Sequence, residues 1–232
     1  MAGKICGTAP VYASLDAIFS GTSFSFFSSC IEVKNTDVLY AEEKALMMKQ
    51  GFSQLTDFCK GRYCAHQALE KIGYYAFPIL RDEYGAPIWP EGITGSISHS
   101  GDAAAAVVAR KTNIQGVGLD LQKREIFPSA VLSVLFHDDE VASFLSIPSD
   151  LADLYAYAIF SAKESAIKCF YATCQYLANL NEIVIAMEWS SGTFSAFIPA
   201  TQNPKSFISD LELMGRVGFD ERYVFSAAWQ VT

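Results

Sequence analysis

The sequence predicts an α+β protein built from two similar halves, and three observations lead to this expectation. First, a chain of 232 residues with 51% hydrophobic and 13% aromatic residues can bury a sizeable core. Second, it contains both a long helical stretch and β-type stretches around turn residues. Third, one order of segments occurs twice: a short acidic helix, a longer helix with basic residues and a strand-like tail. Two pseudo-repeats that meet near Gln115 would account for this order.

The first half begins with an apolar stretch at 11–31, in which buried strand and helix are expected. Charged, glycine and serine residues interrupt it and no basic segment precedes it, so neither a transmembrane helix nor a targeting segment is indicated. AEEKALMMK at 41–49 predicts the short acidic helix, and CKGRYCAHQALEKIG at 59–73 predicts the longer helix. DAAAAVVAR at 102–110 is strand-like and ends this half.

The second half repeats this order of segments. HDDEVASFL at 137–145 predicts the short acidic helix. The segment 150–171 contains neither glycine nor proline and carries apolar residues at helical spacing, so one long helix is expected there. β-type residues flank Ser-Ser-Gly at 184–198, which predicts a hairpin, and RYVFSAAWQ at 222–230 predicts the closing strand.

Charge and cysteine content exclude some classes of function. The formal charge of −8, without a dense Lys/Arg stripe, argues against general nucleic-acid binding. An anionic ligand would therefore require the few basic residues to be concentrated at its site. The cysteines form no CxxC pair, so buried thiols of a cytoplasmic protein are expected rather than disulfides or zinc ligands. They are Cys6, Cys30, Cys59, Cys64, Cys169 and Cys174.

Three short strings carry the chemistry of the chain. They are GSISHS at 95–100, GVGLDLQ at 116–122 and FSAKESAIK at 160–168. In the second string apolar and other residues alternate with a period of two, which places Asp120 and Gln122 on one face of a strand. The opposite face is apolar and is expected to point into the core.

The helix expected at the third string adds a second carboxylate and an ammonium. Glu164 and Lys168 are four residues apart and share a helix face, with Lys163 in the neighbouring row. Mg²⁺ prefers a few carboxylate oxygens together with water and substrate phosphates, so an acid from the strand and one from the helix suit it. Alternatively, Ser161 and Glu164 form a capping box, an explanation that fails if the helix runs unbroken through Ser161.

These strings, together with WPEGITGSISHS at 89–100 and GRYCAHQAL at 61–69, resemble the phosphopantetheinyl transferases of the larger, surfactin-synthetase-activating and enterobactin-synthase component D type. The resemblance covers about 61–168. It implies transfer of the 4′-phosphopantetheine arm of coenzyme A to a serine of a carrier protein, with release of adenosine 3′,5′-bisphosphate. It also implies two α+β halves side by side, with the active site in the cleft between them. Residues 1–115 would carry the nucleotide contacts and 116–232 the metal site.

The resemblance also implies roles for the acidic and basic residues. Asp120 and Glu164 are expected to hold Mg²⁺, with Gln122 at a position where the family most often has a second acid. An amide oxygen can reach magnesium, but it carries no charge and cannot act as a base. Glu164, or a metal-bound water adjacent to it, is then the nearest base for the carrier serine. Lys163 and Lys168 are expected to neutralise charge on the pyrophosphate.

By the same resemblance, coenzyme A is held by several residues of the first half. Ser98 and His99 are expected to contact its phosphates, and Arg62 its 3′-phosphate. His66 stands where a second arginine is common. Gly85 belongs to a Tyr-Gly-Ala-Pro string that resembles the loop lining the adenine pocket. Without the resemblance, Arg62 would be interpreted as an exposed helix residue and His99 as a structural histidine.

The partner is expected to be an acidic acyl, peptidyl or aryl carrier protein domain. The loop at 122–132 combines Lys123 and Arg124 with apolar residues, which suits docking against an acidic helix. An alternative is that Phe127 anchors an ordinary loop in the core. The enterobactin-like strings favour carriers of siderophore, peptide or polyketide biosynthesis, and a monomer is expected.

Two other functions remain open from the sequence. One is a degenerate homologue that binds coenzyme A or a carrier protein without turnover, because Gln122, His66 and Ala86 depart from the family pattern. The other is a different magnesium-dependent phosphotransferase or nucleotidyltransferase with the same acids and lysines. No Walker or kinase glycine loop supports the second possibility.

Overall fold

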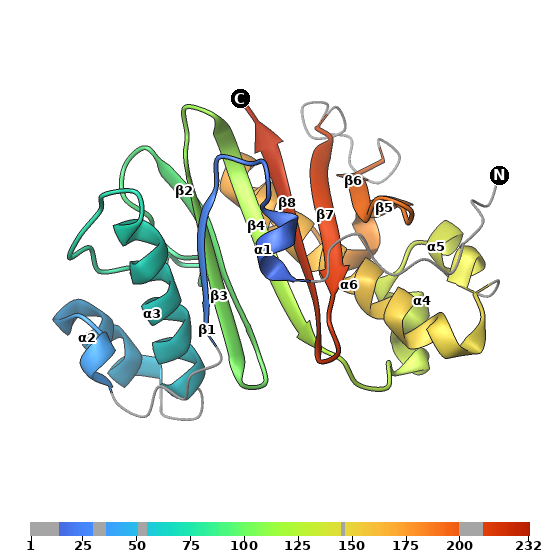
Figure 1. Ribbon diagram of the computed structural model, residues 1–232, viewed down its shortest axis with the longest axis horizontal. Helices are drawn as coiled ribbons and strands as arrows, with labels where there is room; N and C mark the ends of the chain where they lie inside the picture. Colours follow the sequence, from blue (N-terminus) through green and yellow to red (C-terminus); the bar gives the residue numbers. More distant parts are fainter. Residues whose placement is uncertain (1–13, 30–35, 51–54, 145–146, 200–210) are drawn as a thin grey trace.

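The computed structural model describes residues 14–29, 36–50, 55–144, 147–199 and 211–232. Two antiparallel sheets lie at its centre, and long helices cover them (Figure 1). The helices are α1 (Leu15–Ile18), α2 (Ala41–Gln50), α3 (Leu55–Glu70), α4 (Leu132–Leu135), α5 (Asp138–Phe144) and α6 (Ser149–Cys174), with 3-10 turns η1 (Thr36–Val38), η3 (Ser129–Val131) and η4 (Leu180–Glu182). The strands are β1 (Ser25–Ser29), β2 (Ile93–Ser100), β3 (Ala103–Arg110), β4 (Ile114–Lys123), β5 (Val184–Glu188), β6 (Thr193–Phe197), β7 (Leu213–Phe219) and β8 (Tyr223–Val231).

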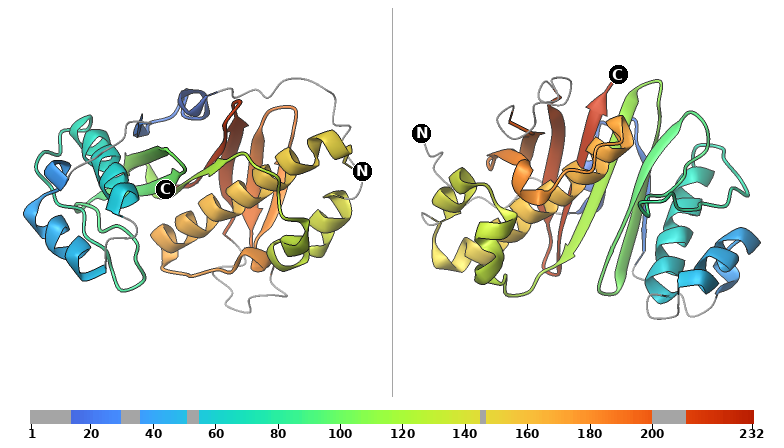
Figure 2. Two further views of the ribbon diagram at one scale, coloured as in Figure 1. Left: turned by 90° about the horizontal axis from the view of Figure 1, so that it is seen from below. Right: turned by 180° about the vertical axis from the view of Figure 1, so that it is seen from behind.

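The first half contains a three-stranded sheet in the order β1-β3-β2. Helix α3 covers one face of this sheet, where its Ala65, Ala68 and Leu69 pack against Ala104 and Ala106 of β3. Small side chains on both surfaces let the helix lie close to the strand. The loop between α3 and β2 leaves this layer on the side where α6 ends (Figure 2, left).

The second half contains a five-stranded sheet in the order β4-β8-β7-β6-β5. The long helix α6 runs across the back of this sheet (Figure 2, right), and its apolar face packs against β5, β6, β7 and β8. Asp120 of β4 lies opposite Ser226 of β8 in the ladder. Alternation along β4 sends Val117, Leu119 and Leu121 into a core on the other face, as the sequence pattern predicts.

This other core lies between the two sheets and joins the halves. It combines residues of β3, β4 and β8 with Ile18 and Phe19 from the N-terminal segment, and it includes Phe225 and Trp229. Each such buried large side chain contributes roughly 1.5–3 kcal/mol relative to exposure. The core therefore fixes how the two sheets face each other.

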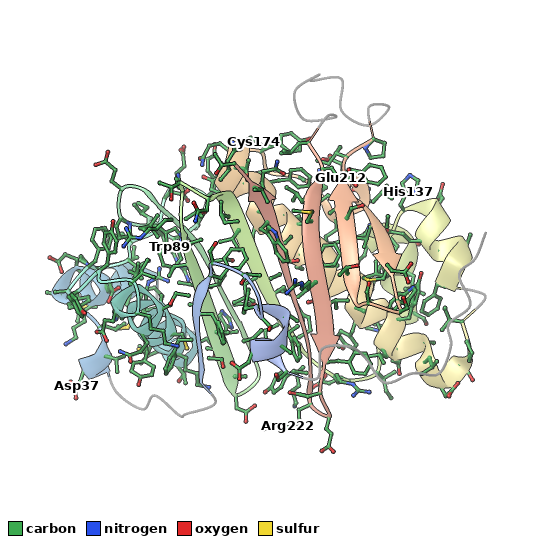
Figure 3. All side chains as sticks on the ribbon, turned by 45° about the horizontal axis from the view of Figure 1, so that its top comes forward. Asp37, Trp89, His137, Cys174, Glu212 and Arg222 are labelled. Atoms are coloured by element: carbon green, nitrogen blue, oxygen red, sulfur yellow. The ribbon has the colours of Figure 1, made fainter. Side chains whose placement is uncertain are left out.

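Polar contacts also cross from one half to the other. The Ser98 hydroxyl accepts the Leu121 N–H at 3.1 Å, and the Ser100 hydroxyl accepts the Lys123 N–H at 2.9 Å. Strands β2 and β4 are thus joined by side-chain hydroxyls and belong to separate sheets. At the tips of the hairpins, Asp102 accepts hydrogen bonds from Arg222 and Tyr223; Figure 3 shows Arg222 at the end of the β7–β8 hairpin.

The topology confirms the expected pair of similar α+β halves. Strands β1, β3 and β2 correspond to β4, β8 and β7, and helices α2 and α3 correspond to α5 and α6. The hairpin β5–β6, expected at 184–198, is an addition to the second half. Helix α6 runs unbroken through Ser161, which excludes the capping-box explanation.

Of the cysteines, Cys59, Cys64, Cys169 and Cys174 are free thiols and the first three are buried, whereas positions 6 and 30 lie outside the described residues. In the part of the chain that the structure describes, no helix is long and apolar enough to cross a membrane.

Candidate active site

Two glycines of β4, Gly116 and Gly118, allow α6 to approach the strand closely at the site. A Cβ atom on Gly118 would overlap the carbonyl oxygen of Ser165 and would lie 2.8 Å from the amide nitrogen of Cys169. A Cβ atom on Gly116 would lie 3.0 Å from the carbonyl oxygen of Cys169. Only glycine fits such contacts. As a result, helix side chains meet the acidic face of β4 directly.

Asp120 is the centre of a cluster that also contains Gln122, Glu164 and Lys168. It is only 3% exposed. The Lys168 ammonium lies 3.0 Å from its Oδ1 atom and also donates to the Leu119 carbonyl at 2.9 Å. The side-chain amide of Gln122 donates to its Oδ2 atom at 2.8 Å, and the Ser98 hydroxyl donates to Oδ1 at 3.3 Å. Both carboxylate oxygens are therefore bonded, and the expected strand face with Asp120 and Gln122 is present.

Glu164 lies on α6, one turn before Lys168, and is partly buried. Burial raises its pKa, the nearby Lys168 ammonium opposes this rise, and the Asp120 carboxylate adds to it. A carboxylate whose pKa is raised by a neighbouring carboxylate marks a place at which a cation is favourable. The structure thus brings together Asp120, Gln122, Glu164 and Lys168. Among the described residues, no group of three or more Asp, Glu, His or Cys side chains is arranged to hold a metal ion.

Lys163 does not belong to this cluster, so the expectation that it contacts a phosphate is wrong for this structure. Its side chain is fully buried. The ammonium lies 2.6 Å from Glu140 Oε2 and donates to the carbonyls of Leu180 and Ile183 at 2.9 and 2.7 Å. Burial lowers its pKa, while Glu140 opposes the change. Neighbouring residues on a helix point about 100° apart, so Lys163 faces away when Glu164 faces β4.

Ser98 is also placed differently from the expectation. It is 5% exposed, and its hydroxyl bonds Asp120 and the Leu121 N–H inside the junction of the two halves. Its neighbour Ser96 lines the cavity described below. The structure therefore gives Ser98 the role of joining β2 to β4 and holding Asp120, rather than an open position toward a ligand.

His99 lies at the surface among several cations. Its side chain is 44% exposed, and its Nδ1 atom lies 3.7 Å from Asp57 Oδ2. The pKa of His99 is lowered, mainly because the ring is partly shielded from water; Asp57 opposes this, and Lys168, Arg81 and Lys60 lower the pKa further. Basic residues from both halves thus gather around His99, although the chain as a whole is acidic.

Arg62 is buried rather than exposed on its helix. It is 4% exposed, lies 4.6 Å above the Phe58 ring, and its Nε atom is 4.0 Å from Glu43. Burial lowers its pKa to about 10, Arg81 contributes to the shift and Glu43 opposes it. Among the residues that the structure describes, its Nε and Nη2 atoms have no hydrogen-bond partner. Unpaired buried donors of this kind suit an anion supplied from outside the chain.

His66 does not take the place of a phosphate-binding arginine. Its Nε2 atom lies 2.9 Å from Glu43 Oε1, and its ring packs against Tyr40 with centroids 4.7 Å apart. Only 8% of the residue is exposed. It therefore belongs to the interior of the first half.

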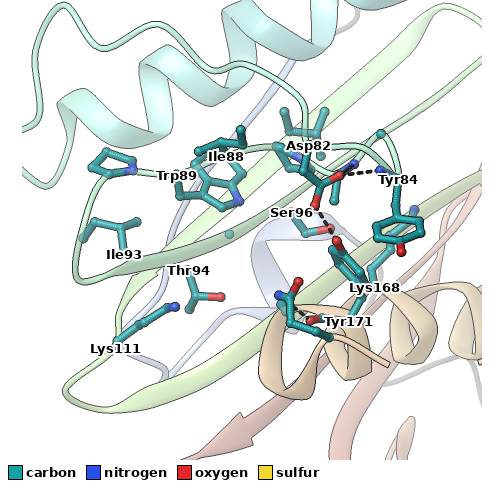
Figure 4. A pocket seen from close by; sticks show the side chains of 18 of the residues that line it. Asp82, Tyr84, Ile88, Trp89, Ile93, Thr94, Ser96, Lys111, Lys168 and Tyr171 are labelled. Atoms are coloured by element: carbon teal, nitrogen blue, oxygen red, sulfur yellow. Dashed lines mark hydrogen bonds between the residues drawn. The ribbon is translucent and has the colours of Figure 1, made fainter. Parts of the chain in front are cut away.

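A cavity of about 600 Å³ lies between the loop before β2 and helix α6. Figure 4 shows Asp82 and Tyr84 of the loop facing Tyr171 and Lys168 of the helix. Gly85 lines the cavity, and its φ of +87° explains why glycine occurs at this turn. The wall also includes Ala86, Pro87, Ile88, Trp89, Thr94, Ser96, Lys111, Ile167, Ala172, Gln175 and Leu177.

The sequence interpretation missed three features that position the site. One is the close packing at Gly118, since glycine in a strand gives no sign of what approaches it. Another is the hydrogen bond between Tyr171 and Asp82, because the two residues are 89 positions apart. A third, Glu140, had a visible signal: it stands in the short acidic helix where Glu43 stands in the first half.

Two models of protein families match the chain. The model described as 4′-phosphopantetheinyl transferase N-terminal domain matches residues 42–109, and the model described as 4′-phosphopantetheinyl transferase superfamily matches residues 116–228. The two matches adjoin near the start of β4, and together they cover both halves.

Curated relatives carry corresponding names. The chain is 30% identical over 160 residues to the 4′-phosphopantetheinyl transferase Svp of Streptomyces mobaraensis, which covers 68% of this chain and 65% of that protein. It is 27% identical to the 4′-phosphopantetheinyl transferase Npt of Nocardia iowensis, over 82% of this chain and 86% of the relative. Enterobactin synthase component D of Salmonella typhi is 33% identical over 58% of this chain and 56% of its own length. The match thus spans slightly less than two thirds of the Streptomyces relative.

Proposed function

Because the chain belongs to the 4′-phosphopantetheinyl transferase superfamily, we propose that it transfers the 4′-phosphopantetheine arm of coenzyme A to a serine of an apo carrier protein. Adenosine 3′,5′-bisphosphate is the leaving product. The observation that carries the proposal is the cluster of Asp120, Glu164 and Lys168 at one end of a 600 Å³ cavity. Lys168 belongs to both the cluster and the cavity wall.

The two halves would bind different parts of coenzyme A. Residues 1–115 would contact the nucleotide of coenzyme A, through Gly85 on the cavity wall and through Arg62 and His99. Support comes from the unpaired buried nitrogens of Arg62 and from the cations that surround His99. Residues 116–232 would hold the reacting pyrophosphate.

The acidic cluster suits Mg²⁺. Asp120 and Glu164 would hold it, and Gln122 would add its Oε1 atom, because its amide nitrogen already donates to Asp120. Magnesium bound there supplies Lewis-acid polarisation of the pyrophosphate. The raised pKa of Glu164, which its burial and Asp120 both favour, supports a cation at this place.

The remaining chemistry belongs to the side chains. Glu164 would accept the proton of the carrier serine as the hydroxyl attacks the β-phosphorus, and the bond to the 5′-phosphate of the nucleotide would break. Lys168 would neutralise charge on the departing phosphate. Lys163 has no part in this step, because its ammonium is enclosed by Glu140 and two carbonyls.

The carrier would dock beside the end of β4. Phe127 is 7% exposed and packs in the core, which agrees with the alternative that it anchors the loop. Ile126 next to it is 86% exposed, and Lys123 and Arg124 precede it at the surface. An exposed apolar residue beside two cations suits an acidic carrier helix. Reversing both charges should raise the carrier KM and leave the coenzyme A KM unchanged; equal effects on both would argue against docking here.

Cellular location, oligomeric state and carrier type are part of the same proposal. Free thiols at the four described cysteines suit a cytoplasmic protein. A monomer suffices, since residues of one chain form the whole site. Similarity to enterobactin synthase component D favours carriers of siderophore, peptide or polyketide biosynthesis.

Mass spectrometry tests the reaction directly. An apo peptidyl or aryl carrier domain incubated with the protein, coenzyme A and magnesium should gain one phosphopantetheine arm, and EDTA should prevent the gain. No gain across several carrier types, with coenzyme A still bound, would instead support a binder without turnover. Gln122→Glu would then test whether the missing third acid is the reason.

A further inference from the structure

A hydrogen bond connects the two halves across the mouth of the cavity. The Tyr171 hydroxyl on α6 donates to Asp82 Oδ2 in the loop of the first half at 2.5 Å (Figure 4). This bond is the main reason why the pKa of Tyr171 is raised to about 12. Burial alone would raise the pKa of Asp82, but the hydrogen bonds that it accepts lower it. A neutral phenol and a charged carboxylate thus face each other throughout the neutral pH range.

Asp82 also organises the loop to which it belongs. Its Oδ1 atom accepts the N–H groups of Tyr84 and Ala86 at 3.0 and 2.9 Å. Its own backbone N–H donates to the Ala86 carbonyl, and the Gly85 N–H donates to the Asp82 carbonyl. The loop at 82–87 is therefore one bonded unit around this carboxylate. A displacement of the Asp82 carboxylate would therefore displace the whole turn.

The bond lies where it controls the width of the cavity. The loop forms one wall, and α6 forms the opposite wall. Tyr171 is three residues after Lys168, so it lies on the same side of the helix as the cation beside Asp120. Tyr84 at the rim contacts the Tyr171 ring at 5.9 Å between centroids and is 61% exposed. The hydroxyl thus joins the loop to the helix directly across the cavity.

We propose that Tyr171 is a positioning residue: through Asp82 it holds the loop at 82–87 at the distance from α6 that accepts the nucleotide of coenzyme A. The inference rests on the proposed function and deepens it, because it names what sets donor affinity. Neither side chain needs to contact the reacting phosphorus. Loss of the hydroxyl should weaken nucleotide binding and leave the chemical step unchanged.

Tyr171→Phe removes only this hydroxyl, and Tyr176→Phe is its matched control. The Tyr176 hydroxyl also donates to a carboxylate, that of Glu182 at 3.0 Å, and neither residue lines the cavity. Calorimetric titration of the full chain with coenzyme A and with adenosine 3′,5′-bisphosphate should show Kd raised about 10-fold for both ligands in Tyr171→Phe. The control should bind both as the wild type does. In turnover, the coenzyme A KM should rise by the same factor, with kcat within about 2-fold and the carrier KM unchanged.

Several results would overturn the proposal. Wild-type affinity in Tyr171→Phe would do so, as would a lower kcat at an unchanged coenzyme A KM, or weaker binding of coenzyme A alone. Thermal unfolding checks that the variant is as stable as Tyr176→Phe. If it is not, Asp82→Ala, which removes the acceptor and keeps the tyrosine ring, must show the same KM effect. A wild-type protein that binds both ligands but transfers nothing would refute the proposed reaction, and the titrations would still decide the role of Tyr171.

Discussion

Each half of the molecule sets a buried glutamate of its short acidic helix against a basic residue 23 positions later on the long helix. Glu43 meets His66 at 2.9 Å in the first half, and Glu140 meets Lys163 at 2.6 Å in the second. The same carboxylates accept two backbone N–H groups each, one at the start of their own helix and one after the long helix. These belong to Tyr40 and Ile79 in the first half and to His137 and Ile185 in the second.

The two halves also correspond in the lysine beside the candidate active site. They differ in the acidic residues around that lysine. Lys71 donates to the Phe26 carbonyl of β1 at 2.7 Å, as Lys168 donates to the Leu119 carbonyl of β4. The next residue along the strand is Phe27 in the first half and Asp120 in the second. Four residues before each lysine stands a glutamine, Gln67, or a glutamate, Glu164. One framework therefore serves both halves, and the acids that define the site occur in only one of them.

The largest effect on transfer activity is expected when the side chains that differ between the halves, Glu164 and Gln67, are exchanged. Glu164→Gln should reduce transfer about 10³-fold, because it removes the base and one of two carboxylates. The opposite change, Gln67→Glu, should leave transfer within about 2-fold, because no acid stands on β1 beside it. Steady-state transfer to an apo carrier measures both. Full activity of Glu164→Gln would contradict the assignment, and unchanged thermal unfolding would show that its fold is intact.

The buried pairs should differ in their contributions to stability. Lys163→Met leaves the Glu140 carboxylate buried without its cation, which costs about 3–5 kcal/mol of unfolding free energy. The corresponding His66→Gln change in the first half should cost less, about 1–3 kcal/mol, because it removes a hydrogen bond and keeps a polar side chain. Urea unfolding measures both losses. A raised coenzyme A KM in a fully stable Lys163→Met would instead return Lys163 to the ligand site.

Adding one methyl group tests the contact between long helix and sheet in each half. Gly118→Ala should force α6 away from β4, with a loss of about 1–3 kcal/mol and lower transfer. In the first half, Gly61→Ala meets only the Ile97 Cγ2 atom at 2.9 Å, a side chain that can move. There the gain of about 0.5–1 kcal/mol in helix propensity should offset the contact. Equal losses by both variants in unfolding experiments would show that the two contacts are equally tight.

The smallest effect is expected where the halves touch at their hairpin tips. Asp102 is exposed, and its pKa is lowered mainly by hydrogen bonds from Arg222 and Tyr223. A lowered pKa means stabilisation that is present above the ordinary aspartate pKa of about 3.9 and is lost as the pH falls toward the lower value. The small drop in melting temperature caused by Asp102→Asn should therefore shrink from pH 6 to pH 3. A difference that grows on acidification would contradict this.

The local patterns of the sequence predicted the parts of the site that depend on one element. Period-two alternation placed Asp120 and Gln122 on one strand face, and the spacing of Glu164 and Lys168 placed them on one helix face. The order of segments predicted both halves. Each of these signals lies within a few residues along the chain.

Features that depend on a distant partner were missed or interpreted wrongly. Lys163 seemed, from its place beside Glu164, to be a phosphate ligand, because nothing adjacent reveals that Glu140 encloses it. Arg62 was an exposed helix residue by pattern alone, yet α3 turns it inward. Tyr171 gave no signal, since its partner belongs to the other half. Only the equal spacing of Glu43 and Glu140 from their basic partners could have been detected in advance.

The hydroxyl contacts between β2 and β4 make it possible to measure the separation of the two halves by amide exchange. The amides of Leu121 and Lys123 are bonded to Ser98 and Ser100 across the junction, whereas the amides of β4 that face β8 belong to the ladder with that strand. If the halves separate without unfolding, these two amides lose their partners first. Their hydrogen–deuterium exchange rates therefore follow the opening of the cleft, and the ladder amides follow the unfolding of the second half.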